Sequence, residues 1–301
     1  MTKTVGVVGL GNMGFGMAKN LLRAGFTVTG YDVRPESVYR LVDIGGHSAA
    51  SPAEAGRDAD AVVIMVMTAD QVRSVIEGEN GLLSTMRQGS SVILSATIGV
   101  SAARQIGDLL NDHGIEILDT CVSGGLPGAD SGTLTLMAGG PDRVFEENLD
   151  VLRAVGDPEK ITHVGPNAGD GQAVKACIQA LIAVTYPGIF ESLVLGAKLG
   201  IDADILRTVI GSSIVGSPLF RIASEHVAAR EFVGTGSHIS TMDKDITLTL
   251  AAARDVGAAL PATAFAAQFL YATTANFPDE DCWAMAKLFE QLSGLATQAV
   301  S

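Results

Sequence analysis

The sequence has little cysteine and little positive charge. Its three cysteines, Cys121, Cys177 and Cys282, are widely spaced and form no CxxC pair, which argues against a disulfide framework or a zinc site and fits a reducing cytoplasm. Only 20 lysines and arginines oppose 33 aspartates and glutamates, for a formal net charge of -13. This charge would repel phosphate backbones and anionic lipid headgroups, so neither nucleic acid nor a membrane surface is expected as a partner.

Several motifs are also missing. The five histidines show no metal-ligand spacing and HExxH is absent, so no metal site is expected; no GxSxG element suggests a hydrolase. The first residues, MTKTVGVVGLGNMG, are too short and too broken for a signal peptide, and no unbroken apolar run is long enough for a bilayer. These absences predict an ordinary globular protein of the cytoplasm.

The 301 residues are 47% hydrophobic, enough for a sizeable core and two domains. Residues 1–164 alternate helical spacing with the apolar runs TVGVV, TVTGY, AVVIMV, SVIL and IEIL, which predicts a parallel, doubly wound α/β sheet. Edge strands are expected at 133–139 and 161–165. Between them, PDRVFEENLDVLRAVG at 141–156 is expected to be helical, because it opens with a proline suited to a first helical turn. Residues 165–301 are expected to form an all-helical domain that begins with a long helix over 168–199 and packs against the first, leaving a cleft.

A glycine motif lies between the first strand and the helical stretch MAKNLLRAG. It reads Gly9-Leu10-Gly11-Asn12-Met13-Gly14. The first glycine permits a tight turn, the second lets backbone approach a pyrophosphate, and the third lets helix pack on strand. The strand-to-helix context favours a Rossmann-type dinucleotide-binding domain over a simple glycine turn.

Asp32 ends the second predicted strand, 32 − 14 = 18 residues after the last glycine, where a carboxylate accepts hydrogen bonds from the adenosine ribose. This favours NAD, with NADP less favoured, although Arg34 nearby would partly accommodate a 2′-phosphate. Met65, Val66 and Met67 follow another strand and are expected near the cofactor's ribose, with a place in the core as the alternative.

A second glycine-rich segment, DTCVSGG at 119–125, follows a predicted strand. Consecutive amides there, together with the hydroxyl of Ser123, would form a nest for a carboxylate; the alternative is a flexible turn.

Four motifs together resemble the β-hydroxyacid dehydrogenase family over nearly the whole chain. They are GLGNMG with MAKNLL, DTCVSGG with GADSGTL, GDGQAVKACIQ, and MDKDI. The resemblance implies NAD-linked oxidation of a small hydroxy acid, a helical domain for substrate and dimerisation, and a homodimer or homotetramer. It also implies the following roles: Ser123, Gly124, Gly125 and Gln179 for substrate, Thr97 and Lys244 for cofactor, and Lys175 for catalysis.

The role implied for Lys175 agrees with the chemistry. When an alcohol becomes a carbonyl, a proton leaves oxygen as hydride leaves carbon, and a nearby amine accepts that proton. Burial beside a positively charged nicotinamide would favour the neutral amine. Without the resemblance, a solvated lysine on a helix surface would be the usual interpretation.

The sequence departs from the family pattern at three places. Cys121 stands where proline is usual, Ala96 replaces a serine before Thr97, and Gln179 replaces the usual asparagine. Glutamine at this position is typical of the L-threonate-like branch, which acts on four-carbon sugar acids. Two alternatives stay open: an imine reductase on the same scaffold, whose members usually lack the lysine, and a non-catalytic nucleotide-binding protein.

Overall fold

The computed structural model describes residues 3–295 and divides the chain into two compact units that meet between Ala176 and Cys177. The last strand of the first unit ends at Gly165, close to the boundary that the sequence predicts at 164/165. The first unit nevertheless continues into the next helix, because the first turn of that helix hydrogen bonds to the sheet at Asp119.

The first unit is built on one eight-stranded sheet with the order β3-β2-β1-β4-β5-β6-β7-β8. All neighbouring strands run parallel except β6 and β7. This arrangement confirms the predicted doubly wound α/β fold. The strands are β1 Thr4–Val8, β2 Thr27–Tyr31, β3 His47–Ser48, β4 Ala61–Ile64, β5 Ser91–Leu94, β6 Glu116–Ser123, β7 Leu134–Gly139 and β8 Gly156–Gly165.

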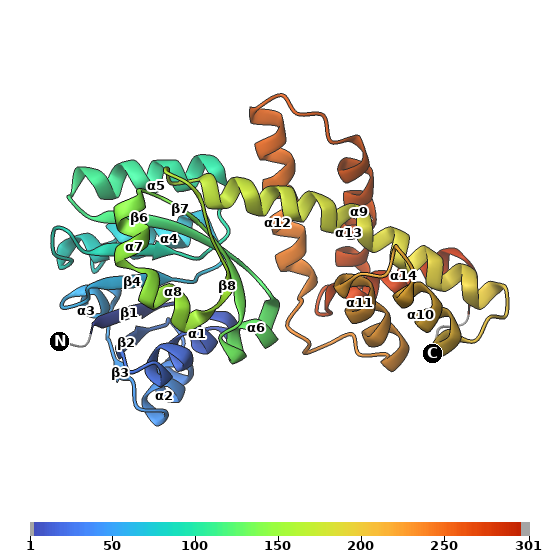
Figure 1. The fold of residues 1–301 in the computed structure, drawn as a ribbon, viewed down its shortest axis with the longest axis horizontal. Helices are drawn as coiled ribbons and strands as arrows, with labels where there is room; N and C mark the ends of the chain where they lie inside the picture. The colour runs from blue at the N-terminus through green and yellow to red at the C-terminus, as the bar shows by residue number, and fades with distance from the viewer. Residues whose placement is uncertain (1–2, 296–301) are drawn as a thin grey trace. The chain divides into compact units, whose positions relative to one another are not determined.

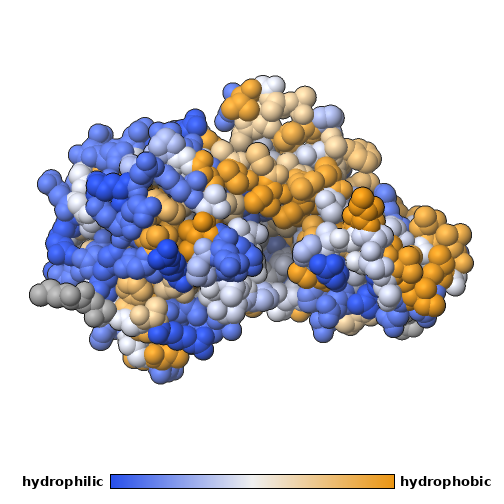
Figure 2. All heavy atoms as spheres, in the orientation of Figure 1, coloured by the Kyte–Doolittle hydropathy of each residue, from blue (hydrophilic) through white to orange (hydrophobic). Residues whose placement is uncertain are grey.

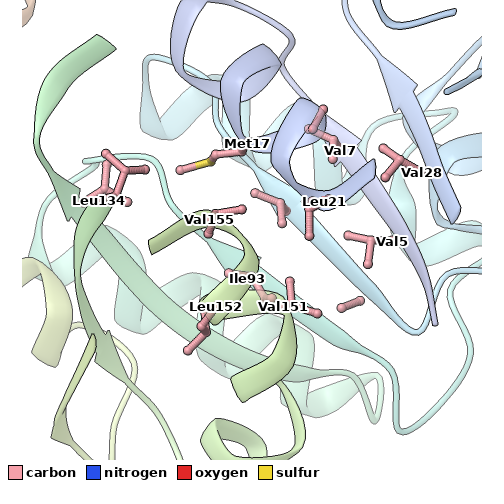
Figure 3. Packing of buried hydrophobic residues seen from close by; sticks show 14 of the residues in the cluster. Val5, Val7, Met17, Leu21, Val28, Ile93, Leu134, Val151, Leu152 and Val155 are labelled. Carbon is pink, nitrogen blue, oxygen red and sulfur yellow. The ribbon is translucent and has the colours of Figure 1, made fainter. Parts of the chain in front are cut away.

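Helices cover both faces of the sheet. Successive side chains of a strand point to opposite faces, so Val7 of β1 belongs to one apolar cluster and Val8 to the other. Figure 3 shows the first cluster, in which Met17, Leu21 and Val155 lie over the sheet. Helices α1 Asn12–Arg23, α2 Pro35–Asp43, α7 Asp142–Glu147 and α8 Leu149–Val155 supply the first cluster, and α3 Pro52–Gly56, α4 Ala69–Glu77 and α5 Val100–Asp112 supply the second.

The first unit differs from the sequence prediction in two details. The glycine-rich stretch after Ser123 forms the short helix α6, Gly125–Ser131, instead of a loop. Gly124 and Gly125, with φ of +127° and +59°, turn the chain directly from strand to helix. The helix expected after Pro141 is divided into α7 and α8 at Asn148, whose φ of -105° lies outside the helical range.

Within the described part of the second unit all the regular structure is helical, as predicted (Figure 1). Its core gathers Phe190 and Leu193 of α9, Phe220 of α11, Ile246 of α12 and Trp283. The elements are α9 Asp170–Lys198, which starts in the first unit, α10 Ala203–Ser212, α11 Pro218–Ala229, α12 Ile239–Asp255, α13 Pro261–Asn276, the 3-10 turn Cys282–Ala284 and α14 Met285–Leu292.

Helix α9 is long and apolar enough to cross a membrane by length and composition, although Gln179, Thr185 and Glu191 interrupt its apolar sequence. The core helix of a globular protein passes the same test, and Tyr186, Phe190 and Leu193 of α9 are buried in the core of the second unit. The helix therefore gives only weak support for a membrane span.

Candidate active site

The glycine motif forms the turn from β1 into α1. Gly9 has a φ of +93°, and a Cβ there would lie 2.4 Å from the carbonyl oxygen of Met65. A Cβ on Gly14 would lie 1.8 Å from the carbonyl oxygen of Gly9, so a side chain at either position would clash with backbone. A Cβ on Gly11, in contrast, would meet only Arg34, at 3.5 Å.

The start of α1 suits an anion. Gly11 is its N-cap residue, and no side chain caps the helix. The backbone N–H groups at the start of a helix attract phosphate when no side chain occupies them. Leu10 is fully buried, whereas Asn12 is exposed and Gly11 and Met13 are half-buried. The residues present therefore fit the pyrophosphate of a dinucleotide.

Asp32 lies directly after β2 and is tied to the glycine turn. Its carboxylate accepts hydrogen bonds from the N–H of Leu10 at 2.7 Å and from the N–H of Arg34 at 2.9 Å, and Nε of Arg34 is 3.2 Å away. Burial by itself raises the pKa of Asp32, but the hydrogen bonds from Arg34 and Leu10 outweigh it and lower the pKa from its usual 3.8. The group is therefore a carboxylate at neutral pH.

The other cofactor candidates of the first unit follow neighbouring strands. Met65, Val66 and Met67 come directly after β4, with Met67 exposed and the other two half-buried, and half-buried Thr97 follows β5. These strands run parallel to β1, so their carboxyl ends share one edge of the sheet. The strand order reverses between β1 and β4, which is where ligands of doubly wound sheets bind.

The substrate candidates Ser123, Gly124 and Gly125 lie at the same edge. Ser123 is the half-buried last residue of β6, and both glycines are exposed. Space is tight around Gly124, where a Cβ would lie 3.3 Å from the side chain of Leu134. The two positive-φ glycines thus end the strand with exposed backbone beside a serine hydroxyl.

Lys175 lies beside this strand end. It sits in the second turn of α9, has only 9% of its surface exposed, and donates a hydrogen bond from Nζ to the carbonyl oxygen of Val122 at 3.1 Å. Val122 directly precedes Ser123, so the amine and the serine belong to one small region of the first unit. A buried amine held in this way is not the solvated surface lysine of the alternative interpretation.

Gln179 and Lys244 belong to the second unit, where Asp245 joins them. Nε2 of Gln179 donates to Oδ2 of Asp245 at 2.5 Å, and Nζ of Lys244 lies 2.9 Å from Oδ1 of the same carboxylate. Gln179 and Asp245 are both buried. The amide orientation of Gln179 is therefore set, with its oxygen Oε1 facing away from the carboxylate.

Sequence reasoning missed the partners that hold these residues. Asp119 and Gln172 are buried and hydrogen bonded to each other, and buried Asp245 directly follows Lys244 in the MDKDI motif. A carboxylate such as Asp119, inside the apolar run IEILDTCV, was a usable signal, because buried acids require partners. Among residues 3–295, no group of three or more His, Cys, Asp and Glu side chains is arranged to hold a metal ion.

Comparison with known proteins identifies the family to which this chain belongs. Residues 4–165 match the model of the NAD binding domain of 6-phosphogluconate dehydrogenase, and residues 169–289 match the NAD-binding model of NADP-dependent 3-hydroxyisobutyrate dehydrogenase. An L-threonate dehydrogenase of Cupriavidus necator is 38% identical over 96% of this chain and 97% of its own. The chain belongs to the β-hydroxyacid dehydrogenase family.

Solved structures of this family share the fold. A 3-hydroxyisobutyrate dehydrogenase of Salmonella typhimurium is 32% identical, with a TM-score of 0.86 over 95% of this chain and 100% of its own. The 3-hydroxyisobutyrate dehydrogenase of Mycobacterium tuberculosis, solved with L-serine, is 33% identical, with a TM-score of 0.85 over 96% and 99%. An imine reductase of Myxococcus stipitatus is only 18% identical and shares the fold alone. As a β-hydroxyacid dehydrogenase, the protein is an NAD(P)-dependent oxidoreductase that acts on CH–OH groups.

Proposed function

We propose that this β-hydroxyacid dehydrogenase transfers hydride between a small β-hydroxy acid and NAD, with Lys175 as the general acid and base. The observation that carries the proposal is the buried amine of Lys175, held 3.1 Å from the Val122 carbonyl at the end of β6. The hydrogen bond to Val122 uses one N–H and orients the nitrogen. In the oxidative direction the neutral amine accepts the hydroxyl proton, and in the reductive direction the ammonium returns it.

Bound NAD supplies the hydride acceptor, and residues 1–164 would hold it. The start of α1 would hold the pyrophosphate, Asp32 would accept hydrogen bonds from the adenosine ribose, and Met65 to Met67 and Thr97 would line the remainder of the site at this sheet edge. The Asp32 carboxylate repels a 2′-phosphate, which favours NAD over NADP. Arg34 is paired with Asp32, and that pairing reduces its availability for a 2′-phosphate.

The carboxylate of the substrate is assigned to Ser123, Gly124 and Gly125. A net charge of -13 opposes the binding of an acid, so local donors must supply the attraction. The exposed backbone of the two positive-φ glycines and the Ser123 hydroxyl are donors of the right kind. Orientation of the acid by this nest is expected to supply much of the rate.

Gln179 points to a substrate with a further hydroxyl. Because its nitrogen donates to Asp245, its oxygen Oε1 is left as the acceptor, and this buried atom has no hydrogen-bond partner among the described residues. A substrate hydroxyl would satisfy it, and a buried acceptor favours ligands that carry such a donor. We therefore favour a four-carbon sugar acid such as L-threonate, with 3-hydroxyisobutyrate as the second candidate.

The direct test follows NADH absorbance with a panel of three- and four-carbon hydroxy acids and with both cofactors. We expect turnover with NAD, with L-threonate ahead of 3-hydroxyisobutyrate, and weaker activity with NADP. Cyclic imines with NADPH form the matched panel for an imine reductase. Activity on imines alone would reject the proposal, and activity on neither panel with tight NADH binding would favour a non-catalytic protein.

Shortening the Gln179 amide should change substrate choice. Gln179→Asn withdraws the carbonyl oxygen by one methylene, so we expect kcat/KM for L-threonate to fall by about tenfold or more relative to 3-hydroxyisobutyrate. The exposed Gln291→Asn provides the control. An unchanged ratio of the two kcat/KM values would remove Gln179 from substrate selection.

A second copy of the chain is the proposed partner of the helical unit. Figure 2 shows hydrophobic residues gathered over the end of α9 and over α10. Exposed apolar residues on this stretch are Leu195, Leu199, Ile201, Ile205 and Val209. Apolar surface of this kind marks interaction sites, so we propose a homodimer or homotetramer, and a monomer in light scattering would contradict it.

We also propose a cytoplasmic location. The chain has only three cysteines, which are widely spaced and form no CxxC pair. Few cysteines without such a pattern are typical of proteins in reducing compartments. Cell fractionation tests the location, and recovery of the protein with washed membranes would reject it.

A further inference from the structure

The side chain of Gln172 is buried and uses its full hydrogen-bonding capacity. Its oxygen Oε1 accepts from the N–H groups of Ile98 and Gly99, both at 3.0 Å. Its nitrogen Nε2 donates to the carbonyl oxygen of Ala96 at 3.0 Å and to Oδ1 of Asp119 at 2.9 Å. A primary amide has two donors and can accept two hydrogen bonds, so all four are engaged.

Asp119 completes the arrangement from the middle of β6. It is fully buried, and its Oδ2 accepts from the N–H of Gly169 at 3.0 Å and from the N–H of Gln172 at 2.9 Å. Gly171 makes this approach possible, because a Cβ there would lie 2.4 Å from the carbonyl oxygen of Asp119. Burial raises the pKa of Asp119 to about 6, against the hydrogen bonds from Gln172, Gly169 and Gly171.

This pair connects three segments that carry the proposed chemistry. The first segment is 96–99, which contains Thr97, and the second is β6, which ends with Val122 and Ser123. The third is the start of α9, where Gln172 lies three residues before Lys175. All of these residues belong to the first unit. We propose that Gln172 and Asp119 are positioning residues, which hold the Lys175 amine at a fixed separation from the segment around Thr97.

The inference rests on the proposed function, since it requires that Lys175 and Thr97 act together on substrate and cofactor. The carboxylate of Asp119 accepts hydrogen bonds from the N–H groups of Gly169 and Gln172, as an ordinary cap at the start of a helix does. The three hydrogen bonds between the Gln172 side chain and the backbone of residues 96, 98 and 99 are additional, and they connect α9 to the segment that follows β5. Together with the bond to Asp119, they fix the segment after β5 relative to β6 and the start of α9. A cap that only ends a helix does not require such bonds.

The test replaces Gln172 by glutamate. A glutamate keeps an oxygen that can accept from the N–H groups of Ile98 and Gly99, but it loses the NH2 group that donates to Ala96 and Asp119. Ala96 and Asp119 then face carboxyl oxygens, so the 96–99 segment shifts relative to α9. We expect kcat to fall by about 10- to 100-fold, because displacements near 1 Å cost this much in rate. NADH affinity should change much less than kcat, since the glycine turn and Asp32 are untouched and only the segment around Thr97 moves.

A primary deuterium isotope effect on kcat separates positioning from a merely structural role. If hydride transfer is slowed by misplacement, the isotope effect measured with substrate deuterated at the reacting carbon rises in Gln172→Glu. The exposed Gln88→Glu is the matched control and should leave kcat and the isotope effect unchanged. Asp119→Asn, which removes one acceptor oxygen, is the second variant and should act in the same direction.

The outcomes are distinct. Wild-type kcat and isotope effect in both variants would overturn the inference while leaving the proposed function intact. Parallel loss of thermal stability and NADH binding in both variants would also overturn it, because the pair would then be structural only. Failure of the proposed function shows elsewhere, as an absence of hydroxy-acid oxidation by the wild-type protein.

Discussion

Lys175→Ala is expected to lower kcat by about 10²- to 10⁴-fold while leaving NADH binding in place. The amine is the buried group at the end of β6 that is proposed to take the hydroxyl proton, and alanine cannot replace it. Because the glycine turn and Asp32 lie on other elements, the cofactor should still bind. Steady-state kinetics with the preferred hydroxy acid and NADH fluorescence titration measure the two quantities separately.

Two further lysine variants sharpen this result. Lys175→Arg retains a positive charge but cannot give up a proton at neutral pH, so it should be nearly as inactive as alanine. Lys198→Ala changes an exposed lysine at the other end of the same helix and should leave kcat unchanged. Substantial activity in Lys175→Arg would mean that charge, and not proton transfer, is the contribution of this residue.

Alanine at Gly14 and at Gly11 should affect different properties, although both glycines belong to one motif. A Cβ on Gly14 would lie 1.8 Å from the carbonyl oxygen of Gly9, so the backbone must move. We expect the free energy of unfolding to fall by about 3 kcal/mol or more, together with loss of NADH binding. Denaturant unfolding measures this cost.

Gly11→Ala should instead fold normally and bind NADH about 10- to 100-fold more weakly, a loss of about 1.4 to 2.8 kcal/mol. Gly11 has a φ of -66°, which alanine adopts without strain, and its Cβ would meet only Arg34 at 3.5 Å. The methyl group would occupy the surface that the pyrophosphate approaches. Wild-type NADH affinity in this variant would show that the phosphates do not lie over Gly11.

The cofactor end was the most predictable part of the molecule. The glycine motif is local, since a turn between a strand and a helix constrains consecutive residues, and the structure forms that turn at Gly9. The place of Asp32 followed from the regular length of the helix and strand between it and Gly14. The roles of Lys175, Ser123 and Gln179, in contrast, came from family resemblance, because a lysine, a serine or a glutamine has no distinctive local pattern.

The chain sequence alone determined the alternation of strands and helices, the glycine turn and the change to helical structure after Gly165, because these depend on residues close together in the chain. Tertiary structure decided what surrounds Lys175. The side-chain partners of Gln172 lie 53 to 76 residues away, and Asp119 accepts a hydrogen bond from the first turn of α9 across 53 residues. Such contacts depend on how strands pair and where a helix docks, so no short segment of sequence contains them.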